Sequence, residues 1–358
     1  MKIAFYINTM KSGGGAERVV SRLANYMCKN NNVTIITIVR ESVEYNYDDS
    51  IGRVVLDEIE SNKKNAISRI KKLRSVCEKM KPDILISFCE GASEFAVIAT
   101  LLSKQKLIIS LRNAPEHDFP SFTSRIIARA LFSFSNGAVF QTKEICDWYP
   151  LNIRNKAKII LNPVEDTLYN TKWNPIKWRV VAVGRLTEQK NHKILIEAFA
   201  KVVKKFPEAE LYIYGRGNLE QDLIQQIKVF DLERKVFLCG YTDDIYECIS
   251  RANIFVLPSI VEGLPNALME AMTIGVPSIA TDCIGGGAKE LLGDNEFGLL
   301  VDNNNLNAVE ESLTMLLRNE QLQQNFSLKC REKSRSFNMD NIGSQWIGYI
   351  EKIITEKG

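Results

Sequence analysis

The chain has 358 residues, of which 45% are hydrophobic and 25% charged, and its formal net charge is +3. This composition is typical of a soluble globular protein, and the length exceeds what one ordinary hydrophobic core supports, so we expect two domains. Nothing in the sequence points to a nucleic-acid partner.

The first residues, MKIAFYINTMKSGGG, contain an apolar run that is too short for a secretory signal. No later run approaches the roughly 20 apolar residues of a membrane-spanning helix. The eight cysteines form no C-x-x-C pair, which favours buried free thiols over a disulfide framework or a zinc site. We therefore expect a cytoplasmic protein.

Three consecutive glycines, Gly13, Gly14 and Gly15, separate the first strand-like run from a helical pattern. Glycine allows the backbone to approach a ligand closely, and a helix N-terminus favours negative charge. The stretch is neither G-x-G-x-x-G nor a Walker loop. It is interpreted as a loop that faces a phosphate or an acceptor, with a simple tight turn as the alternative.

Residues 1–165 contain 24 Lys and Arg against 17 Asp and Glu, whereas residues 166–358 contain 22 against 26. The most basic block is 63–81, KKNAISRIKKLRSVCEKMK, whose apolar residues recur at helical spacing. The block indicates either an ordinary solvated helix or a patch that meets anionic lipid or an anionic acceptor. If the block does meet an anionic surface, its apolar residues could still be buried against a sheet, so that only its charges would bind.

Short apolar runs alternate with helical patterns along the whole chain, which predicts parallel sheets covered on both faces. The strands expected in the first half are 2–8, 33–39, 83–88, 106–111, 137–142 and 157–162. Those expected in the second half are 179–184, 210–215, 235–240, 254–259, 277–282 and 298–301. The sequence therefore predicts two doubly wound α/β domains, 1–165 and 176–340, joined within 161–178.

Ligands collect at the carboxyl ends of strands in open α/β sheets, so residues at these ends are candidates for a site. Arg185 follows the strand expected at 179–184, and Lys190 precedes a helix five residues later. The guanidinium of an Arg, which donates two parallel hydrogen bonds, and the ammonium of a Lys can together neutralise a diphosphate without a metal. The alternative is a pair of solvated loop cations, and His192 is interpreted as structural.

The stretch 261–275, VEGLPNALMEAMTIG, places Glu262 in a strand-end loop and Glu270 inside the following helix. The helix-start amides near Asn266 suit phosphate oxygens, and each carboxylate can accept two hydroxyl hydrogen bonds from a sugar or ribose diol. Together with the cation pair, these residues predict a pocket for a sugar nucleotide. The alternative is that one carboxylate caps the helix and the other lies on the solvent-exposed face of the helix.

The second half resembles family-4 retaining glycosyltransferases in four stretches: 183–191, 214–223, 237–282 and 285–292. The E-x7-E pattern of that family is matched by Glu262 and Glu270, and its diphosphate-binding Arg and Lys by Arg185 and Lys190. The resemblance implies a GT-B fold, with two Rossmann-like domains facing each other across a cleft and a C-terminal helix, 341–358, that crosses back to the first domain. It also implies further donor contacts at Gly215, Tyr241, Thr242, Gly263, Leu264, Pro265, Asn266 and Ala267.

The first half is similar, in 110–119, 137–150 and 159–164, to bacterial members that build lipid-linked oligosaccharides or capsular polysaccharides. Many relatives have a His where this chain has Arg112 and Asn113. The resemblance places Arg112 near the transferred sugar, with a structural ion pair as the alternative, and His117 could also reach that sugar.

These observations predict a retaining hexosyltransferase that moves a sugar, an N-acetylhexosamine or a hexose, from a UDP-sugar to a saccharide acceptor. The expected acceptor is linked to undecaprenyl diphosphate, and the enzyme is expected on the inner face of the plasma membrane. The chain contains no D-x-D sequence, so we expect neither a metal ion nor a cofactor. A nucleotide-sugar epimerase and a non-catalytic sugar-nucleotide-binding subunit are the alternatives.

Overall fold

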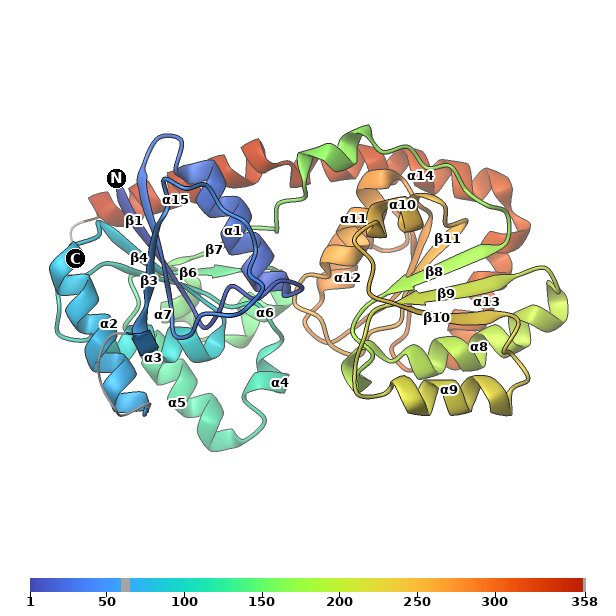
Figure 1. Ribbon diagram of the computed structural model, residues 1–358, viewed down its shortest axis with the longest axis horizontal. Helices are drawn as coiled ribbons and strands as arrows, with labels where there is room; N and C mark the ends of the chain where they lie inside the picture. The colour runs from blue at the N-terminus through green and yellow to red at the C-terminus, as the bar shows by residue number, and fades with distance from the viewer. Residues whose placement is uncertain (59–64, 357–358) are drawn as a thin grey trace. The chain divides into compact units, whose positions relative to one another are not determined.

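The computed structural model describes residues 1–58 and 65–356, and the chain divides into two compact units. Unit 1 comprises Met1–Pro163 and Met339–Gly358, and unit 2 comprises Val164–Asn338. Each unit is a parallel sheet with helices on both faces, which confirms the predicted α/β class (Figure 1).

Unit 1 contains a seven-stranded parallel sheet of order β3-β2-β1-β4-β5-β6-β7. Its strands are β1 (Lys2–Ile7), β2 (Asn32–Thr37), β3 (Gly52–Val55), β4 (Ile84–Phe88), β5 (Leu107–Ser110), β6 (Gly137–Phe140) and β7 (Ala157–Ile159). Strand β3 was not predicted, because only two of its four residues, Val54 and Val55, are apolar, and it pairs with β2 alone at the sheet edge. The strand order reverses between β1 and β4, where a ligand is expected at the carboxyl ends.

The helices of unit 1 pack on the two faces of its sheet. They are α1 (Gly15–Met27), α2 (Ala66–Met80), α3 (Glu90–Thr100), α4 (Pro115–Asp118), α5 (Phe122–Phe132), α6 (Lys143–Trp148), α7 (Leu151–Arg154) and α15 (Met339–Thr355), with a 3-10 turn η1 (Leu56–Glu58). Helices α1 and α15 share one apolar core with the sheet, and α2, α3, α5, α6 and α7 share the other. In α15, Trp346 is fully buried and the Tyr349 hydroxyl accepts a hydrogen bond from Ala138 N at 2.9 Å.

Unit 2 contains a six-stranded parallel sheet of order β10-β9-β8-β11-β12-β13. Its strands are β8 (Arg179–Val183), β9 (Glu210–Tyr214), β10 (Val236–Gly240), β11 (Ile254–Leu257), β12 (Ser278–Thr281) and β13 (Leu299–Val301). All six were predicted, since each is a continuous apolar run. The order reverses between β8 and β11, so the loops that follow these two strands flank the expected ligand position.

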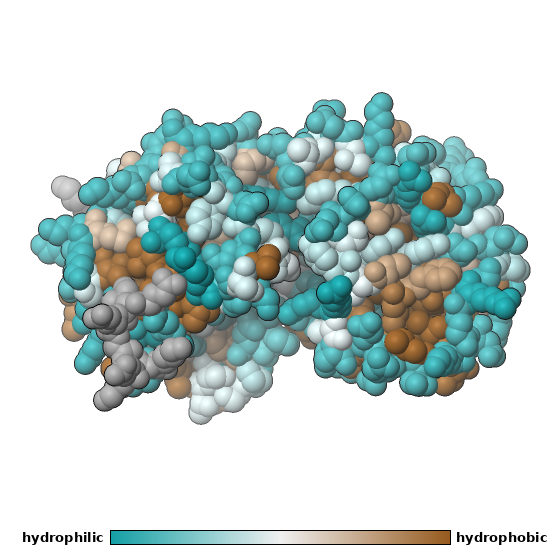
Figure 2. Space-filling view, in the orientation of Figure 1, coloured by the Kyte–Doolittle hydropathy of each residue, from teal (hydrophilic) through white to brown (hydrophobic). Residues whose placement is uncertain are grey.

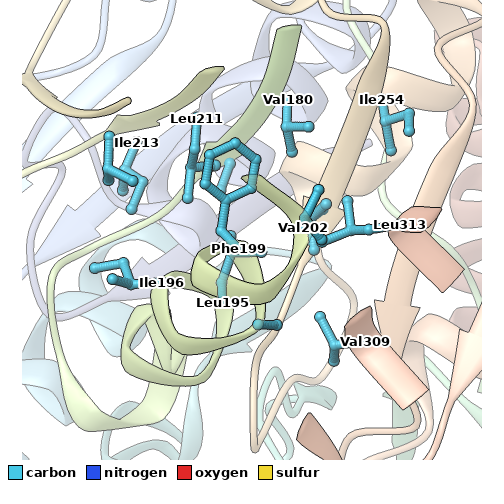
Figure 3. Packing of buried hydrophobic residues seen from close by; sticks show 14 of the residues in the cluster. Val180, Leu195, Ile196, Phe199, Val202, Leu211, Ile213, Ile254, Val309 and Leu313 are labelled. Carbon is cyan, nitrogen blue, oxygen red and sulfur yellow. The ribbon is translucent and has the colours of Figure 1, made fainter. Parts of the chain in front are cut away.

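The helices of unit 2 are α8 (His192–Lys205), α9 (Glu220–Val229), α10 (Ile245–Ser250), α11 (Asn266–Ile274), α12 (Gly287–Leu292), α13 (Leu306–Arg318) and α14 (Glu320–Ser334), with 3-10 turns η2 (Asp166–Asn170), η3 (Glu188–Lys190) and η4 (Arg335–Phe337). Helices α8, α9 and α13 bury their apolar sides in one core (Figure 3). In this core Phe199 of α8 lies among side chains of β8, β9 and α13. The face of the molecule seen in Figure 2 is mostly hydrophilic, with hydrophobic residues gathered in small patches.

Candidate active site

The loop after β8 lies at the point where the strand order of unit 2 reverses. Hydrogen bonds from Gly184 N to Tyr214 O (2.9 Å) and from Leu186 N to Arg216 O (3.0 Å) hold it against the end of β9. Gly215 has a φ of +141°, and a Cβ there would lie 2.0 Å from Gly184 O, so only glycine fits. The predicted donor contact Gly215 therefore also has a packing role. On this loop the Arg185 side chain is exposed to solvent.

Lys190 ends the short turn η3, directly before α8, and its ammonium group forms an ion pair with the carboxylate of Glu262. The side chains are 17% and 9% exposed respectively, so the pair is largely removed from water. Ser259 Oγ donates a second hydrogen bond to Glu262 Oε1 at 2.7 Å. The structure thus joins two predicted site residues that are 72 positions apart in the sequence.

Backbone hydrogen bonds link the two loops that carry this pair. Ile260 N donates to Gln189 O at 2.9 Å, and Gln189 Nε2 donates to Val261 O at 2.9 Å. Glu262 N donates to Ile284 O at 3.0 Å, which ties the same loop to the segment after β12. Because these bonds connect three strand-end segments, the ion pair has a rigid support.

The stretch before α11 is buried at Gly263, Leu264 and Pro265. Pro265 precedes the first turn of α11 and provides no side-chain cap for its amides. A Cβ on Gly287 would lie 2.0 Å from Gly263 O, so the glycine run at 285–287 packs directly against this stretch. The helix N-terminus is therefore fixed at the carboxyl end of β11, with the polarity that suits an anion.

Asn266 and Ala267 are half-buried in the first turn of α11, whereas Glu270 is only 4% exposed in the second. Glu262 is also only 7% exposed. The two glutamates are therefore not a helix cap and a residue on a solvent-exposed helix face. Two buried carboxylates beside one helix start are unusual in a solvated surface loop. Their burial argues against the alternative in which one carboxylate lies on a solvent-exposed helix face, and the ligand-facing role stays a prediction.

Tyr241 and Thr242 follow β10 at the same edge of the sheet. The Tyr241 side chain is exposed and its hydroxyl donates to Asp243 Oδ1 at 2.9 Å, while Thr242 Oγ1 accepts from Asp244 N at 3.1 Å. His192, at the start of α8, is buried, and burial lowers its pKa to about 4. A neutral buried imidazole fits the structural role predicted for His192.

In unit 1 the glycine loop joins β1 to α1. Gly13 has a φ of +93°, and a Cβ there would meet nothing within 4 Å, so the backbone is open on that side. A Cβ on Gly14 would lie 2.0 Å from Glu17 Oε2, at the end of a flexible side chain that can move aside. Gly13 N donates to Tyr45 Oη at 3.0 Å, and α1 begins at Gly15. The loop thus combines one open glycine with a carboxylate folded over the helix start.

Arg112 directly follows Leu111 at the end of β5, and its guanidinium packs on the Phe88 ring with the carbon Cζ 4.4 Å from the ring centroid. Its Nη1 donates to Asn162 Oδ1 at 2.8 Å, whereas the buried Nε and Nη2 atoms make no hydrogen bond. Burial lowers the pKa of Arg112 to about 10. Two unsatisfied donors on a buried cation are costly, and an anionic ligand would satisfy them.

Asn113 and His117 lie together at the start of α4. Asn113 Nδ2 donates to Asp118 Oδ1 at 2.8 Å and lies 3.2 Å from His117 Nδ1. His117 Nδ1 is also 3.1 Å from Asp118 Oδ1, and half of the imidazole side chain is exposed. Asp118, which was not predicted, therefore orients both of these predicted residues.

Glu90 was also not predicted, although it follows the buried strand β4 and a strand-end carboxylate could have been singled out. Glu90 Oε1 accepts from Arg112 N at 3.0 Å and from Asn113 N at 3.3 Å. Burial, with a smaller contribution from Asp118, raises the pKa of Glu90 from 4.5 to about 8. Cys89 before it has a φ of +69°, which strains the backbone at this strand end.

The basic block 63–81 includes Lys63 and Lys64, which lie outside the described residues, and all of α2. Its apolar residues Leu73, Val76 and Cys77 are buried in the core that α2 shares with the sheet. Most of the stripe is thus used for packing inside unit 1, whereas Ile67 is 65% exposed. In the described part of the chain, no helix is long and apolar enough to span a bilayer.

Comparison with known proteins agrees with these features. Residues 169–333 match the family model of the group 1 glycosyl transferases. A glycosyltransferase of Haemophilus influenzae without an assigned function is 28% identical over 98% of this chain and 99% of its own length. A Campylobacter jejuni enzyme, named as an N-acetyl-D-galactosaminyltransferase acting on a GalNAc-containing PP-undecaprenol saccharide, is 28% identical over 99% of both chains.

Solved structures extend the likeness to both units. Anabaena HepE, in complex with UDP, superposes with a TM-score of 0.83 at 19% identity, over 98% of this chain and all of that one. Sucrose-phosphate synthase of Thermosynechococcus elongatus superposes with a TM-score of 0.84 at 15% identity, over 99% of both chains. Together these matches support a glycosyltransferase with the GT-B fold. The two Rossmann-like domains predicted from the sequence are thereby confirmed, and the matches support a glycosyltransferase, whereas membership of family 4 stays a prediction.

Proposed function

We propose that this GT-B glycosyltransferase is a retaining, metal-independent member of family 4 that uses a UDP-sugar. The observation that carries the proposal is the cluster at the strand-order reversal of unit 2, where Lys190, Glu262 and the start of α11 meet beside Arg185. HepE, which has the same fold, has been solved with UDP and with UDP-glucose. On this basis the donor site is proposed to lie in unit 2.

The diphosphate of the donor is proposed to lie against the N-terminus of α11, with the side chains of Arg185 and Lys190 around it. Lys190 is already paired with Glu262, so a bound diphosphate would share the ammonium group with that carboxylate. Glu270 is proposed to accept hydrogen bonds from the ribose diol, and Glu262 to contact the transferred sugar. Tyr241 and the neighbouring Thr242 backbone are proposed to meet the base.

The proposed reaction is a displacement with retention of configuration. The acceptor hydroxyl attacks the anomeric carbon on the face from which the diphosphate leaves, so the configuration is retained. The bond to the diphosphate breaks as the new glycosidic bond forms, and a diphosphate oxygen takes the acceptor proton. Fixed cations and helix-start amides stabilise the charge that develops on the leaving group, which typically contributes several kcal/mol.

The proposed acceptor is a saccharide linked to undecaprenyl diphosphate, and the transferred sugar is an N-acetylhexosamine or a hexose. Two Campylobacter jejuni relatives that span nearly the whole chain are named as N-acetylgalactosaminyltransferases for undecaprenol-linked saccharides. In unit 1, the cluster of Arg112, Asn113 and His117 is proposed to face the transferred sugar and the acceptor. The open backbone at Gly13 is proposed to face the donor phosphate.

The test is transfer from radiolabelled UDP-sugars to an undecaprenyl-diphosphate-linked saccharide, with and without EDTA, followed by NMR of the product linkage. We expect an α-linked product from an α-linked donor and equal rates with the chelator. Hydrolysis or isomerisation of the donor without transfer would contradict the proposed acceptor chemistry. An inverted linkage would contradict the retaining mechanism.

A further inference from the structure

Glu90 and Asp118 form a carboxyl pair beyond the carboxyl ends of β4 and β5. Glu90 begins α3, directly after β4, and Asp118 ends the short helix α4. The two carboxyl groups are hydrogen-bonded to each other, and no N–H group in the described part of the chain donates to the buried atom Asp118 Oδ2. Two ionised carboxylates cannot form such a bond, because each can only accept. The contact therefore requires a proton on one of the two.

The surroundings of the pair place this proton on Glu90. Glu90 Oε1 accepts from the backbone amides of Arg112 and Asn113, at 3.0 and 3.3 Å, and both are neutral donors. Asp118 Oδ1 accepts from Asn113 Nδ2 at 2.8 Å and lies 3.1 Å from His117 Nδ1, which can form a charge-assisted bond. Burial, with a smaller contribution from Asp118, raises the pKa of Glu90 to about 8, so this carboxyl group is mostly neutral at pH 7.

The other titratable and charged groups around the carboxyl pair come from several elements. They are Glu17 of α1, Cys89 before α3, Arg112 after β5, Glu116 and His117 of α4, Arg129 of α5 and Tyr149 after α6. Burial raises the pKa of the Cys89 thiol and of the Tyr149 hydroxyl well above their usual values, so both are neutral at pH 8. The two arginines and the two further carboxylates offset one another in charge. The loss of the Glu90 proton is therefore the change of charge expected in this cluster near pH 8.

Asp118 supports the two side chains that are proposed to face the transferred sugar and the acceptor, those of Asn113 and His117. We propose that the neutral carboxyl group of Glu90 is a positioning group for sugar transfer, because its hydrogen bond to Asp118 fixes both sugar-facing side chains. When Glu90 loses its proton, two like charges lie side by side without a donor between them, so Asp118 turns away and both side chains lose their support. This inference rests on the proposed function.

The test measures sugar transfer between about pH 6.5 and 9 with the wild type and three full-length variants. Glu90→Gln still accepts from the two backbone amides, and its amide group can donate to Asp118 at every pH. Glu90→Met keeps an unbranched side chain but neither donates nor accepts. The matched control is Glu94→Gln, which makes the same change one turn later in α3, at a half-buried residue whose pKa is raised by burial alone.

The transfer rate of the wild type should fall about tenfold between pH 7 and pH 9, because roughly one tenth of the molecules keep the Glu90 proton at the higher pH. Glu94→Gln should show the same fall, whereas Glu90→Gln should have the wild-type rate at pH 7 and keep it at pH 9. Glu90→Met should be slow at every pH. UDP binding by calorimetry should be the same in all four proteins, since the proposed donor site is in unit 2.

Three results would overturn the inference. The first is a wild type that keeps its rate at pH 9, and the second is a Glu90→Gln variant that retains the fall of the wild type. The third is a Glu90→Met variant that is folded by circular dichroism and transfers sugar as fast as Glu90→Gln, because the hydrogen bond to Asp118 would then be unnecessary.

A measurement without substrate separates this inference from the proposed function. The chain has two histidines, so the ring signals of His117 and His192 can be assigned by NMR with one His192→Asn variant. The His117 signal of the wild type should move in a step near pH 8, and Glu90→Gln should remove this step. If no protein transfers sugar but this difference is seen, the proposed function fails and the coupling of Glu90 to His117 stands. A His117 signal that depends on pH in the same way in both proteins would overturn the inference.

Discussion

The ion pair between Lys190 and Glu262 should contribute to both stability and catalysis, and the two contributions can be separated. Lys190→Met keeps an unbranched side chain but leaves the Glu262 carboxylate, 9% exposed, without its cation. Breaking a buried pair in this way typically costs 3–5 kcal/mol. Because Ser259 keeps its 2.7 Å hydrogen bond to the carboxylate, we expect the low end, about 3 kcal/mol.

The double variant Lys190→Met/Glu262→Gln should recover most of that loss, because Gln is neutral and can still accept the hydrogen bond from Ser259. Urea unfolding of the wild type, both single variants and the double variant measures the coupling free energy, which we expect to be at least ~1.5 kcal/mol. Additive effects, within about 0.5 kcal/mol, would refute a coupled pair. Transfer activity should stay low in all three variants, since restoring neutrality does not restore the cation for the diphosphate.

Four further outcomes are expected. Arg185→Ala should lower kcat about 100-fold with an unchanged unfolding midpoint, because the side chain is exposed; a near-normal kcat would exclude a role in leaving-group stabilisation. Transfer should be insensitive to EDTA, and loss that Mg²⁺ or Mn²⁺ restores would contradict the metal-free mechanism. Calorimetry should show that Glu270→Gln weakens UDP binding whereas Glu262→Gln mainly lowers turnover; the reverse ranking would exchange their roles. The folded protein keeps the Glu90 proton up to about pH 8, while an ordinary carboxyl loses it near 4.5, so the free energy of unfolding should fall as the pH rises between these values. Glu90→Gln should remove this fall in urea unfolding, and identical pH profiles for variant and wild type would contradict the raised pKa.

Local sequence determined the elements of this protein and the residues at their ends. Twelve of the strands are continuous apolar runs, and a buried parallel strand needs little more than that pattern to form. Arg185, Lys190 and Glu262 could be singled out because each follows such a run, and carboxyl ends meet at one edge of a parallel sheet. The edge strand β3 was not recognised because its segment, Gly52–Val55, begins with Gly and Arg and contains only two apolar residues.

Tertiary structure decided which of these residues meet and which faces are covered. The pairing of Lys190 with Glu262 depends on the neighbouring positions of β8 and β11, which are far apart in the sequence. The raised pKa of Glu90 depends on burial and on Asp118, and neither can be read from its position after a strand. Helices α2 and α5 both have apolar residues at helical spacing, but only packing shows that most of the stripe of α2 is buried while one face of α5 is exposed. Periodicity reveals an apolar face, whereas what covers that face depends on contacts between residues distant in sequence.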